Sequence, residues 1–371
     1  MNFYTFVVRD FIFKRGVNLK FIIEFIDYVN IVFLTILAVF VLVLIVFHIY
    51  SGAKVKSNQR LAKRITTLLG EGDDGTKKIK KIKKLFTPNG MRVLENLSET
   101  IDEDELELLR KVLSTENFTK YFRDNLTFKN KSVALLTTKL IAEFKLDGFM
   151  PEILTNIKRW EKDSEAQQVG LLALFLNGKK NAIVELLSHK DFKLAISFRT
   201  MQELMECFNG DKASLFKDMI ARECDVYVHR ACIQCIGNEK IYELAEDVQL
   251  FLDSENLNLR ISSARALGEL EYKPAKEKLL KILPESDWEL ISAIVEALSK
   301  ISIEDCYETI LPFVYHKEWW VRYRTAKILV TLPENDKLIE DIEKSNDKYA
   351  NEIVEYMLQR KKLVGSVLKN D

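Results

Sequence analysis

Hydrophobic residues recur at a fixed interval of about 31 residues along the C-terminal two-thirds of the chain. The repeat is marked by an apolar anchor at Val133, Ala166, Ile196, Val228, Leu259, Leu290 and Val321. A second apolar residue follows eight positions later at Ile141, Leu174, Leu204, Ile236, Leu267, Leu298 and Leu329. Eight residues are slightly more than two helical turns, so both members of a pair share one helix face. Another apolar stripe starts twenty residues after the anchor at Val248, Leu279 and Ile310. The spacing predicts two amphipathic helices in each unit.

Residues that cap helices stand three positions before most anchors, at Asn130, Asp163, Asp225, Asn256 and Asp287. Their side chains can accept hydrogen bonds from the free N–H groups of a helix N-terminus. Lys193 and Glu318 break this column, and Asp191 indicates a local register shift in the third unit. Two capped helices in each unit are typical of an α-solenoid, whose units bury their apolar faces by stacking.

The predicted fold class is therefore all-α. A repeat solenoid is expected over residues 130–371, with N-terminal capping helices within 91–129. The helices expected there are Met91–Ile101 and Asp102–Ser114, and a helix over Tyr349–Lys362 is expected to close the C-terminal end.

Three segments resemble the second helix of HEAT repeats: residues 228–231, 259–268 and 321–326. They read as Val-His-Arg-Ala, Leu-Arg-Ile-Ser-Ser-Ala-Arg-Ala-Leu-Gly and Val-Arg-Tyr-Arg-Thr-Ala. The sixth unit departs from the pattern because Ile291 stands where Arg is expected. The short units are also similar to the HEAT-like repeats of phycobilisome lyases. The resemblance covers about residues 130–362 and implies a scaffold with an extended binding surface, without implying a reaction.

The segment from Ile31 to Tyr50 contains twenty residues without a charge. A helix of this length covers about 30 Å, the thickness of the hydrocarbon core of a bilayer. We therefore expect a single transmembrane helix over 28–50, preceded by an extracytoplasmic or interfacial segment, 1–27. Because basic residues follow the span, the positive-inside rule places the solenoid in the cytoplasm and the N-terminus outside the cell membrane. A buried core helix and a cleaved signal peptide are the alternatives, and both fit the length poorly.

Residues 51–90 form a basic amphipathic stalk in this interpretation. Lysine stems can cover apolar surface while their ammonium groups reach lipid phosphates. The candidates for contact with anionic lipid headgroups are Arg60, Lys63, Arg64, Lys77, Lys78, Lys80, Lys81, Lys83 and Lys84. A solvated linker and a nucleic-acid-binding segment are the alternatives. Residues 70–75 match GxGxxG, but their three carboxylates would repel a pyrophosphate, so we expect a flexible break there.

Charge is distributed unevenly along the chain. The chain holds 55 basic and 55 acidic residues, yet residues 93–371 carry 39 basic and 49 acidic ones. Helical-repeat DNA glycosylases share this general shape, but they need a basic surface for the phosphate backbone, so no nucleic-acid partner is expected. The five cysteines are an odd number, which predicts no disulfide framework and favours a reducing compartment.

Two clusters carry candidate chemistry. Cys224, His229, Cys232 and Cys235 resemble a zinc site in spacing, but three ligands along one helix lie too far apart to share one ion. We therefore interpret these thiols as core packing, and no metal or other cofactor is expected.

The second cluster is Trp319–Trp320 with Arg322 and Arg324. Trp and Arg are enriched in binding hot spots. Trp288 stands 31 residues before Trp319, so we expect Trp319 to fill the inter-repeat core and the arginines to meet acids of the preceding turn, while Trp320 is free for a partner. The candidates for partner contact are Trp320, Arg322, Arg324 and Arg260.

We expect a non-enzymatic, membrane-anchored adaptor that binds a protein partner, with no small-molecule substrate. The resemblance implies a membrane-bound glycosyltransferase or a similar complex as one such partner. The alternatives are a lyase- or DNA-glycosylase-like enzyme on a HEAT-like fold, and a lipid-responsive sensor that uses the Lys-rich stalk.

Overall fold

The computed structural model describes residues 103–127, 130–332 and 335–367, together with 28–29, 31–33, 35–37, 40, 60, 91 and 93–94. All regular structure among these residues is helical. The chain divides into two compact units, Met1–Glu105 and Leu106–Asp371.

In the first unit, the described residues from 28 to 40 are helical, and Ile31, Phe33 and Ile36 expose most of their apolar side chains. None of the helices in the described residues has the length and apolar character needed to cross a membrane. The segment 1–27, most of the predicted span 28–50 and nearly all of the stalk 51–90 lie outside the described residues. Arg60 alone of the lipid-headgroup candidates is described, and it is helical and exposed.

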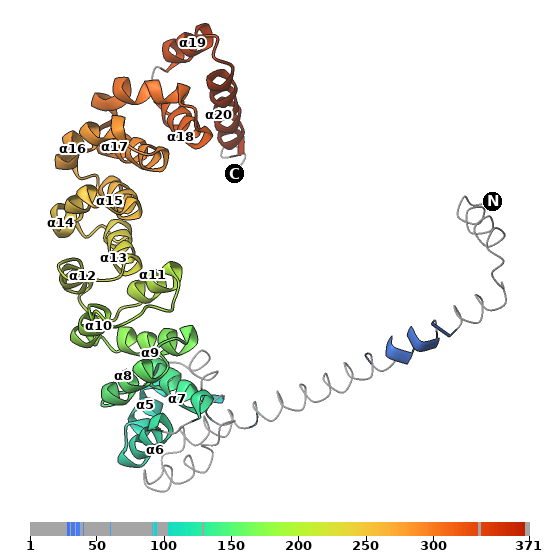
Figure 1. The fold of residues 1–371 in the computed structure, drawn as a ribbon, viewed down its shortest axis with the longest axis vertical. Helices are drawn as coiled ribbons and strands as arrows, with labels where there is room; N and C mark the ends of the chain where they lie inside the picture. Colours follow the sequence, from blue (N-terminus) through green and yellow to red (C-terminus); the bar gives the residue numbers. More distant parts are fainter. Residues whose placement is uncertain are drawn as a thin grey trace. The chain divides into compact units, whose positions relative to one another are not determined.

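The helices of the second unit follow one another along the column in Figure 1. They are α5 Glu103–Leu113 (which starts in the first unit), α6 Glu116–Thr127, α7 Lys131–Glu143, α8 Met150–Arg159, α9 Ser164–Leu176, α10 Lys180–Leu187, α11 Phe198–Glu206, α12 Lys212–Ile220, α13 Val226–Asn238, α14 Ala245–Leu250, α15 Leu257–Glu269, α16 Lys276–Ile282, α17 Trp288–Ile310, α18 Trp319–Leu329, α19 Asp336–Lys344 and α20 Lys348–Val367. Short 3₁₀ turns lie at Tyr242–Leu244, Phe251–Asp253, Lys273–Ala275, Leu283–Glu285 and Leu311–Tyr315.

These helices form two rows. The second helix of each repeat packs against the second helix of the next, in the order α7, α9, α11, α13, α15, α17, α18 and α20 (Figure 1). We call this the second-helix row. The first helices α6, α8, α10, α12, α14 and α16 each pack against a helix of that row. The predicted all-α solenoid is confirmed.

The apolar pattern of the sequence is the core of the solenoid. Six of the seven anchors are buried, Val133 is half-buried, and the residue eight positions after each anchor is buried throughout. Val248, Leu279 and Ile310 of the first helices are fully buried against them. Since each unit buries one face of two helices, stacking is what completes its core.

Side-chain caps begin four of the second helices as expected. Asn130 accepts a hydrogen bond from the Val133 amide at 3.3 Å, and Asp163 accepts one from the Ala166 amide at 3.0 Å. Asp225 and Asn256 cap α13 and α15 in the same way. Asp287 occupies the capping position of α17, but its side chain accepts no hydrogen bond there.

The third unit departs from the expectation. Its second helix, α11, is capped by Ser197, whose hydroxyl accepts a hydrogen bond from the Thr200 amide at 3.1 Å. A register shift is therefore present, but towards the C-terminus and not towards Asp191, and the anchor Ile196 precedes the helix. The cause is a loop before α11 that is tied to α9 by the buried side chain of Gln167. Its amide nitrogen donates to the carbonyls of Glu161 and Lys193, and its oxygen accepts from the Ala195 amide.

Helix α17 combines two helices that the repeat pattern predicts separately, the second helix of one unit and the first helix of the next. Its backbone leaves the helical region at Ser302, with φ −168° and ψ 73°. The Ser302 hydroxyl donates to the Asp305 carboxylate at 2.7 Å, which steadies the start of the second segment. The stretch after Ser302 ends at the buried Ile310 and serves as the first helix of the next unit.

Candidate protein-binding surface

Trp319, Trp320 and Tyr323 form an aromatic cluster at the start of α18, in which the two indoles are exposed and Tyr323 is half-buried. The ring of Trp319 stacks on Tyr323 with centroids 4.9 Å apart, and Trp320 meets Trp319 edge-on at 4.7 Å. Trp319 is 45% exposed and Trp320 is 54% exposed. The expectation that Trp319 fills the inter-repeat core is therefore wrong, because the neighbouring tyrosine holds it at the surface. Trp288, one unit earlier, is half-buried.

Arg322 is turned inward and is only 9% exposed. Its Nη1 donates to the carbonyls of His316 and Lys317 at 2.7 and 2.8 Å, and its guanidinium lies 5.2 Å from the ring centroid of Tyr349. It contacts carbonyl groups and an aromatic ring in place of the predicted acids. Arg322 therefore holds the loop before α18 and offers little surface to a partner.

Arg324 forms an ion pair with Glu296 of α17, a residue of the preceding repeat and not of the preceding turn. Trp320 and Arg324 are four residues apart, so they lie on one face of α18. Arg260 lies in the first turn of α15 and is half-buried. Trp320 and Arg324 therefore lie on the same side of α18. Glu296, the ion-pair partner of Arg324, lines a neighbouring pocket.

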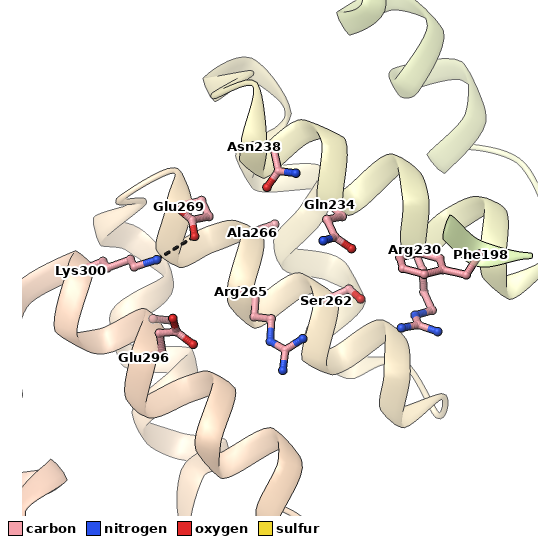
Figure 2. A pocket seen from close by; sticks show the side chains of 11 residues that line it. Phe198, Arg230, Gln234, Asn238, Ser262, Arg265, Ala266, Glu269, Glu296 and Lys300 are labelled. Carbon is pink, nitrogen blue, oxygen red and sulfur yellow. Dashed lines mark hydrogen bonds and ion pairs between the residues drawn. The ribbon is translucent and has the colours of Figure 1, made fainter. Parts of the chain in front are cut away.

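This pocket lies between α13, α15 and α17 and has a volume of about 250 Å³. Figure 2 shows the side chains of Arg230, Arg265 and Glu296 reaching into it from three successive helices. Most of its polar lining occupies equivalent positions of the repeat. Six residues after the anchor stand Gln234, Arg265 and Glu296, and ten residues after it stand Asn238, Glu269 and Lys300.

Both acids of the pocket are already paired. Lys300 contacts Glu269 at 2.7 Å, and Arg324 contacts Glu296. Arg230 and Arg265 form no ion pair with any described carboxylate. The guanidinium of Arg230 lies 4.3 Å from the centroid of the Phe198 ring, an attractive cation–π arrangement. Burial lowers the pKa of Arg265, and burial together with the charge of Arg265 lowers that of Arg230.

The sequence reasoning missed this pocket. The signal was present, because the positions six and ten residues after the anchors Ile196, Val228, Leu259 and Leu290 change between amide, cation and acid while these anchors stay apolar. Such variable polar positions in a repeat mark a solvent-facing row. Which of them meet across the helices depends on the step from one repeat to the next.

Two of the three thiols in the cysteine cluster are part of the core. Cys232 and Cys235 are fully buried, and the Cys232 sulfur lies 3.6 Å from the sulfur of Met205. Burial raises the pKa of Cys235 to about 12 and that of Cys232 well above its ordinary value. His229 points elsewhere, with Nε2 2.9 Å from the Arg222 carbonyl oxygen. The packing interpretation is confirmed for Cys232 and Cys235, whereas Cys224 is half-buried with its sulfur 3.4 Å from the Ser188 hydroxyl. The described part of the chain holds no group of three or more His, Cys, Asp or Glu side chains arranged to hold a metal ion.

Comparison with known proteins gives a family match and similar solved structures. Residues 213–299 match the family of HEAT repeats. That match spans α13 and α15 and the part of α17 that carries Glu296, so it includes most of the pocket. The crystal structure of an engineered protein from the Northeast Structural Genomics Consortium is similar at 13% identity and a TM-score of 0.32, over 81% of this chain and 84% of that one. No curated protein matches the chain. The second unit is a HEAT-repeat-like helical solenoid, a fold that generally acts as a scaffold for protein interactions.

Proposed function

We propose that this protein is a non-enzymatic adaptor, anchored by a single transmembrane helix, whose cytoplasmic solenoid holds a protein partner at the bilayer. The observation that carries the proposal is the aromatic cluster of Trp319, Trp320 and Tyr323 on the second-helix row. Large aromatic side chains that remain in water lose the free energy that burial would supply, about 1.5–3 kcal/mol for a large apolar side chain. Trp and Tyr are also the residues that most often carry binding energy at interfaces.

The position of the cluster supports a broad contact surface. Trp320 shares a helix face with Arg324. Arg324 forms an ion pair with Glu296, which lines the pocket of Figure 2. A partner lying along the second-helix row would cover the aromatic cluster and the charged pocket together. An apolar anchor point flanked by polar groups is the usual arrangement of a protein interface.

The N-terminal region supports the membrane part of the proposal. The uncharged stretch 31–50 has the length of a bilayer span, and Lys and Arg dominate the residues that follow it. Near an anionic leaflet each such charge contributes about 1 kcal/mol to membrane association. Anchoring also raises the local concentration of the solenoid near a membrane-associated enzyme complex, which strengthens binding without new contacts.

The partner surface can be tested by affinity purification of the intact protein from solubilised membranes. The double substitution Trp319→Ala, Trp320→Ala is expected to lower partner recovery at least tenfold. Trp160→Ala is the matched control, because Trp160 follows α8, a first helix, and so lies outside the second-helix row. Its ring lies against Arg159. Recovery of the bait alone, across several detergents, would contradict the adaptor. Equal recovery with the double variant would remove the aromatic cluster as the contact.

The anchor can be tested separately by alkaline carbonate washing of membranes. The intact chain is expected to stay in the membrane pellet, and a chain lacking residues 1–50 is expected to be released. Release of the intact chain would contradict the span. Substituting Gln for the six lysines between Lys77 and Lys84 is expected to leave the intact chain in the pellet, since the apolar stretch provides the anchor.

A further inference from the structure

The pocket between α13, α15 and α17 holds two guanidinium groups that lack an acid. Arg230 comes from α13 and Arg265 from α15; both line the pocket, and Figure 2 shows them extending to the same side of the second-helix row. The two acids of the pocket are paired with Lys300 and Arg324. Among the described residues, therefore, no carboxylate remains to balance Arg230 and Arg265.

The side chain of Arg230 is held in place before any ligand binds. Phe198 supports the guanidinium of Arg230 at 4.3 Å, and the Nε of Arg230 is buried without a hydrogen-bond partner in the described part of the chain. Burial lowers the pKa of Arg230 and of Arg324, and the charge of Arg265 lowers both further, so Arg265 repels these two neighbours. An anion placed beside Arg230 and Arg265 relieves this repulsion. Guanidinium groups bind carboxylates through two parallel hydrogen bonds, which makes such pairs strong and directional.

The surroundings favour a peptide over a polyphosphate chain. Glu269 and Glu296 line the same pocket, and they would repel a nucleic-acid backbone that carries a charge at every step. The volume of about 250 Å³ admits one side chain. Gln234, Asn238 and Ser262 add neutral donors and acceptors that suit the amides of an adjoining backbone.

We infer that the pocket receives an Asp or Glu side chain from an acidic peptide segment of the partner, bound between Arg230 and Arg265. The inference rests on the proposed adaptor function and specifies the chemistry of its partner. The flanking pairs Lys300–Glu269 and Arg324–Glu296 border the site and limit it to a short acidic motif.

The test measures binding of a fluorescein-labelled neutral peptide that carries one Glu to the purified full-length chain, by fluorescence anisotropy. The same peptide with Gln in place of Glu is the matched probe. Arg265→Gln and Arg230→Gln are each expected to weaken binding of the Glu peptide about tenfold or more, because a charge-assisted pair is lost. Arg265→Lys keeps the charge without the planar fork, and an intermediate loss is expected.

Arg199→Gln is the control for net charge, since Arg199 is 88% exposed and pairs with Glu203 on its own helix. It is expected to bind as the unaltered chain does. Thermal unfolding followed by circular dichroism identifies variants that lose structure. If Arg265→Gln is one of them, the binding of the Glu peptide by Arg265→Lys tests the role of the guanidinium instead. Equal binding of the Glu and Gln peptides, or unchanged binding in the Arg230 and Arg265 variants, would overturn the inference. Tighter binding of inorganic phosphate than of the peptide would reassign the pocket to a free anion.

The outcome is separable from that of the adaptor proposal. Peptide binding by the purified chain needs no membrane and no natural partner. Loss of partner recovery in the tryptophan variant, with no dependence on Arg230 or Arg265, would leave the adaptor standing and remove this site. Peptide binding without any partner recovered from membranes would leave the site and remove the adaptor.

Discussion

A Cβ atom added to Gly268 would lie 2.7 Å from the Cα atom of Ala297. The helices α15 and α17 therefore approach each other so closely at this point that only glycine fits at position 268. The same relationship recurs one unit earlier, where a Cβ on Gly237 would lie 2.8 Å from the Cα of Ala266. The two glycines are 31 residues apart, as are the two alanines. Successive second helices therefore cross at one repeated contact point, which sets the step of the solenoid beneath the candidate binding pocket.

Gly268→Ala is expected to lower the free energy of unfolding by about 1–3 kcal/mol, the usual cost of overpacking a core. The added methyl group meets backbone, which cannot move aside without displacing α17. Gly170→Ala is the comparison, because the three atoms nearest to its added Cβ belong to the side chains of Ile157 and Ile153 and not to the backbone. Chemical denaturation measures both, and an equal or smaller loss at Gly268 would contradict the close crossing.

Gln167→Leu is expected to destabilise the chain by about 2–4 kcal/mol. The substitution leaves the carbonyls of Glu161 and Lys193 and the amide of Ala195 without their partner. Gln202→Leu is the control, because the Gln202 amide donates only to Glu206 on its own helix. Thermal unfolding measures the difference, and hydrogen exchange at Ala195 should rise in the Gln167 variant. Slow exchange at Ala195 in that variant would show that the loop is held by other contacts.

Glu271→Gly is expected to stabilise the chain by up to about 1 kcal/mol. Glu271 follows α15 with φ +49°, and the amides of Glu271 and Tyr272 donate back to the carbonyls of Gly268 and Leu267, which is a Schellman motif. A left-handed conformation costs a residue with a Cβ about 1–2 kcal/mol, and the greater unfolded-state entropy of glycine offsets part of the gain.

The converse substitution tests the same physics. Gly178 occupies the corresponding position after α9 with φ +62°. Gly178→Ala is expected to destabilise, because the left-handed strain is joined by a Cβ contact at 2.3 Å to the carbonyl oxygen of Asn209. Differential scanning calorimetry of both variants is the measurement. A rise in melting temperature for Gly178→Ala would refute this explanation.

Stability is expected to fall in alkaline solution because of Cys235. Burial raises its pKa from 9.0 to about 12 in the folded chain, so the unfolded chain releases the proton first. The contribution is complete below pH 9 and is lost as pH rises from about 9 to about 12, by up to about 4 kcal/mol. Unfolding of the intact chain should therefore show a steeper loss across this window than unfolding of Cys235→Ala. Parallel pH profiles would exclude the effect.

The repeat could be predicted from the sequence because its signals are local. The anchors such as Leu259 and Leu267 lie on one helix face whatever the neighbouring repeat does, and a cap such as Asn256 acts within its own first turn. The exposed position of Trp319 could not be predicted in this way. Its equivalent one unit earlier, Trp288, is half-buried, and the difference depends on Tyr323 stacking against the indole.

The sequence by itself determined the helix pairs, their length and their capped starts, because helical periodicity and hydrogen-bonded caps involve residues within a few positions of one another. Only the tertiary structure decided that Arg230 and Arg265 share a pocket, that Arg324 pairs with Glu296 and that Gln167 holds the loop before α11. These contacts join residues from different helices, and most of them join different repeats. The step between α15 and α17, which places Arg265 and Glu296 in one pocket, depends on the close crossing at Gly268 and Ala297, and no single helix encodes that distance.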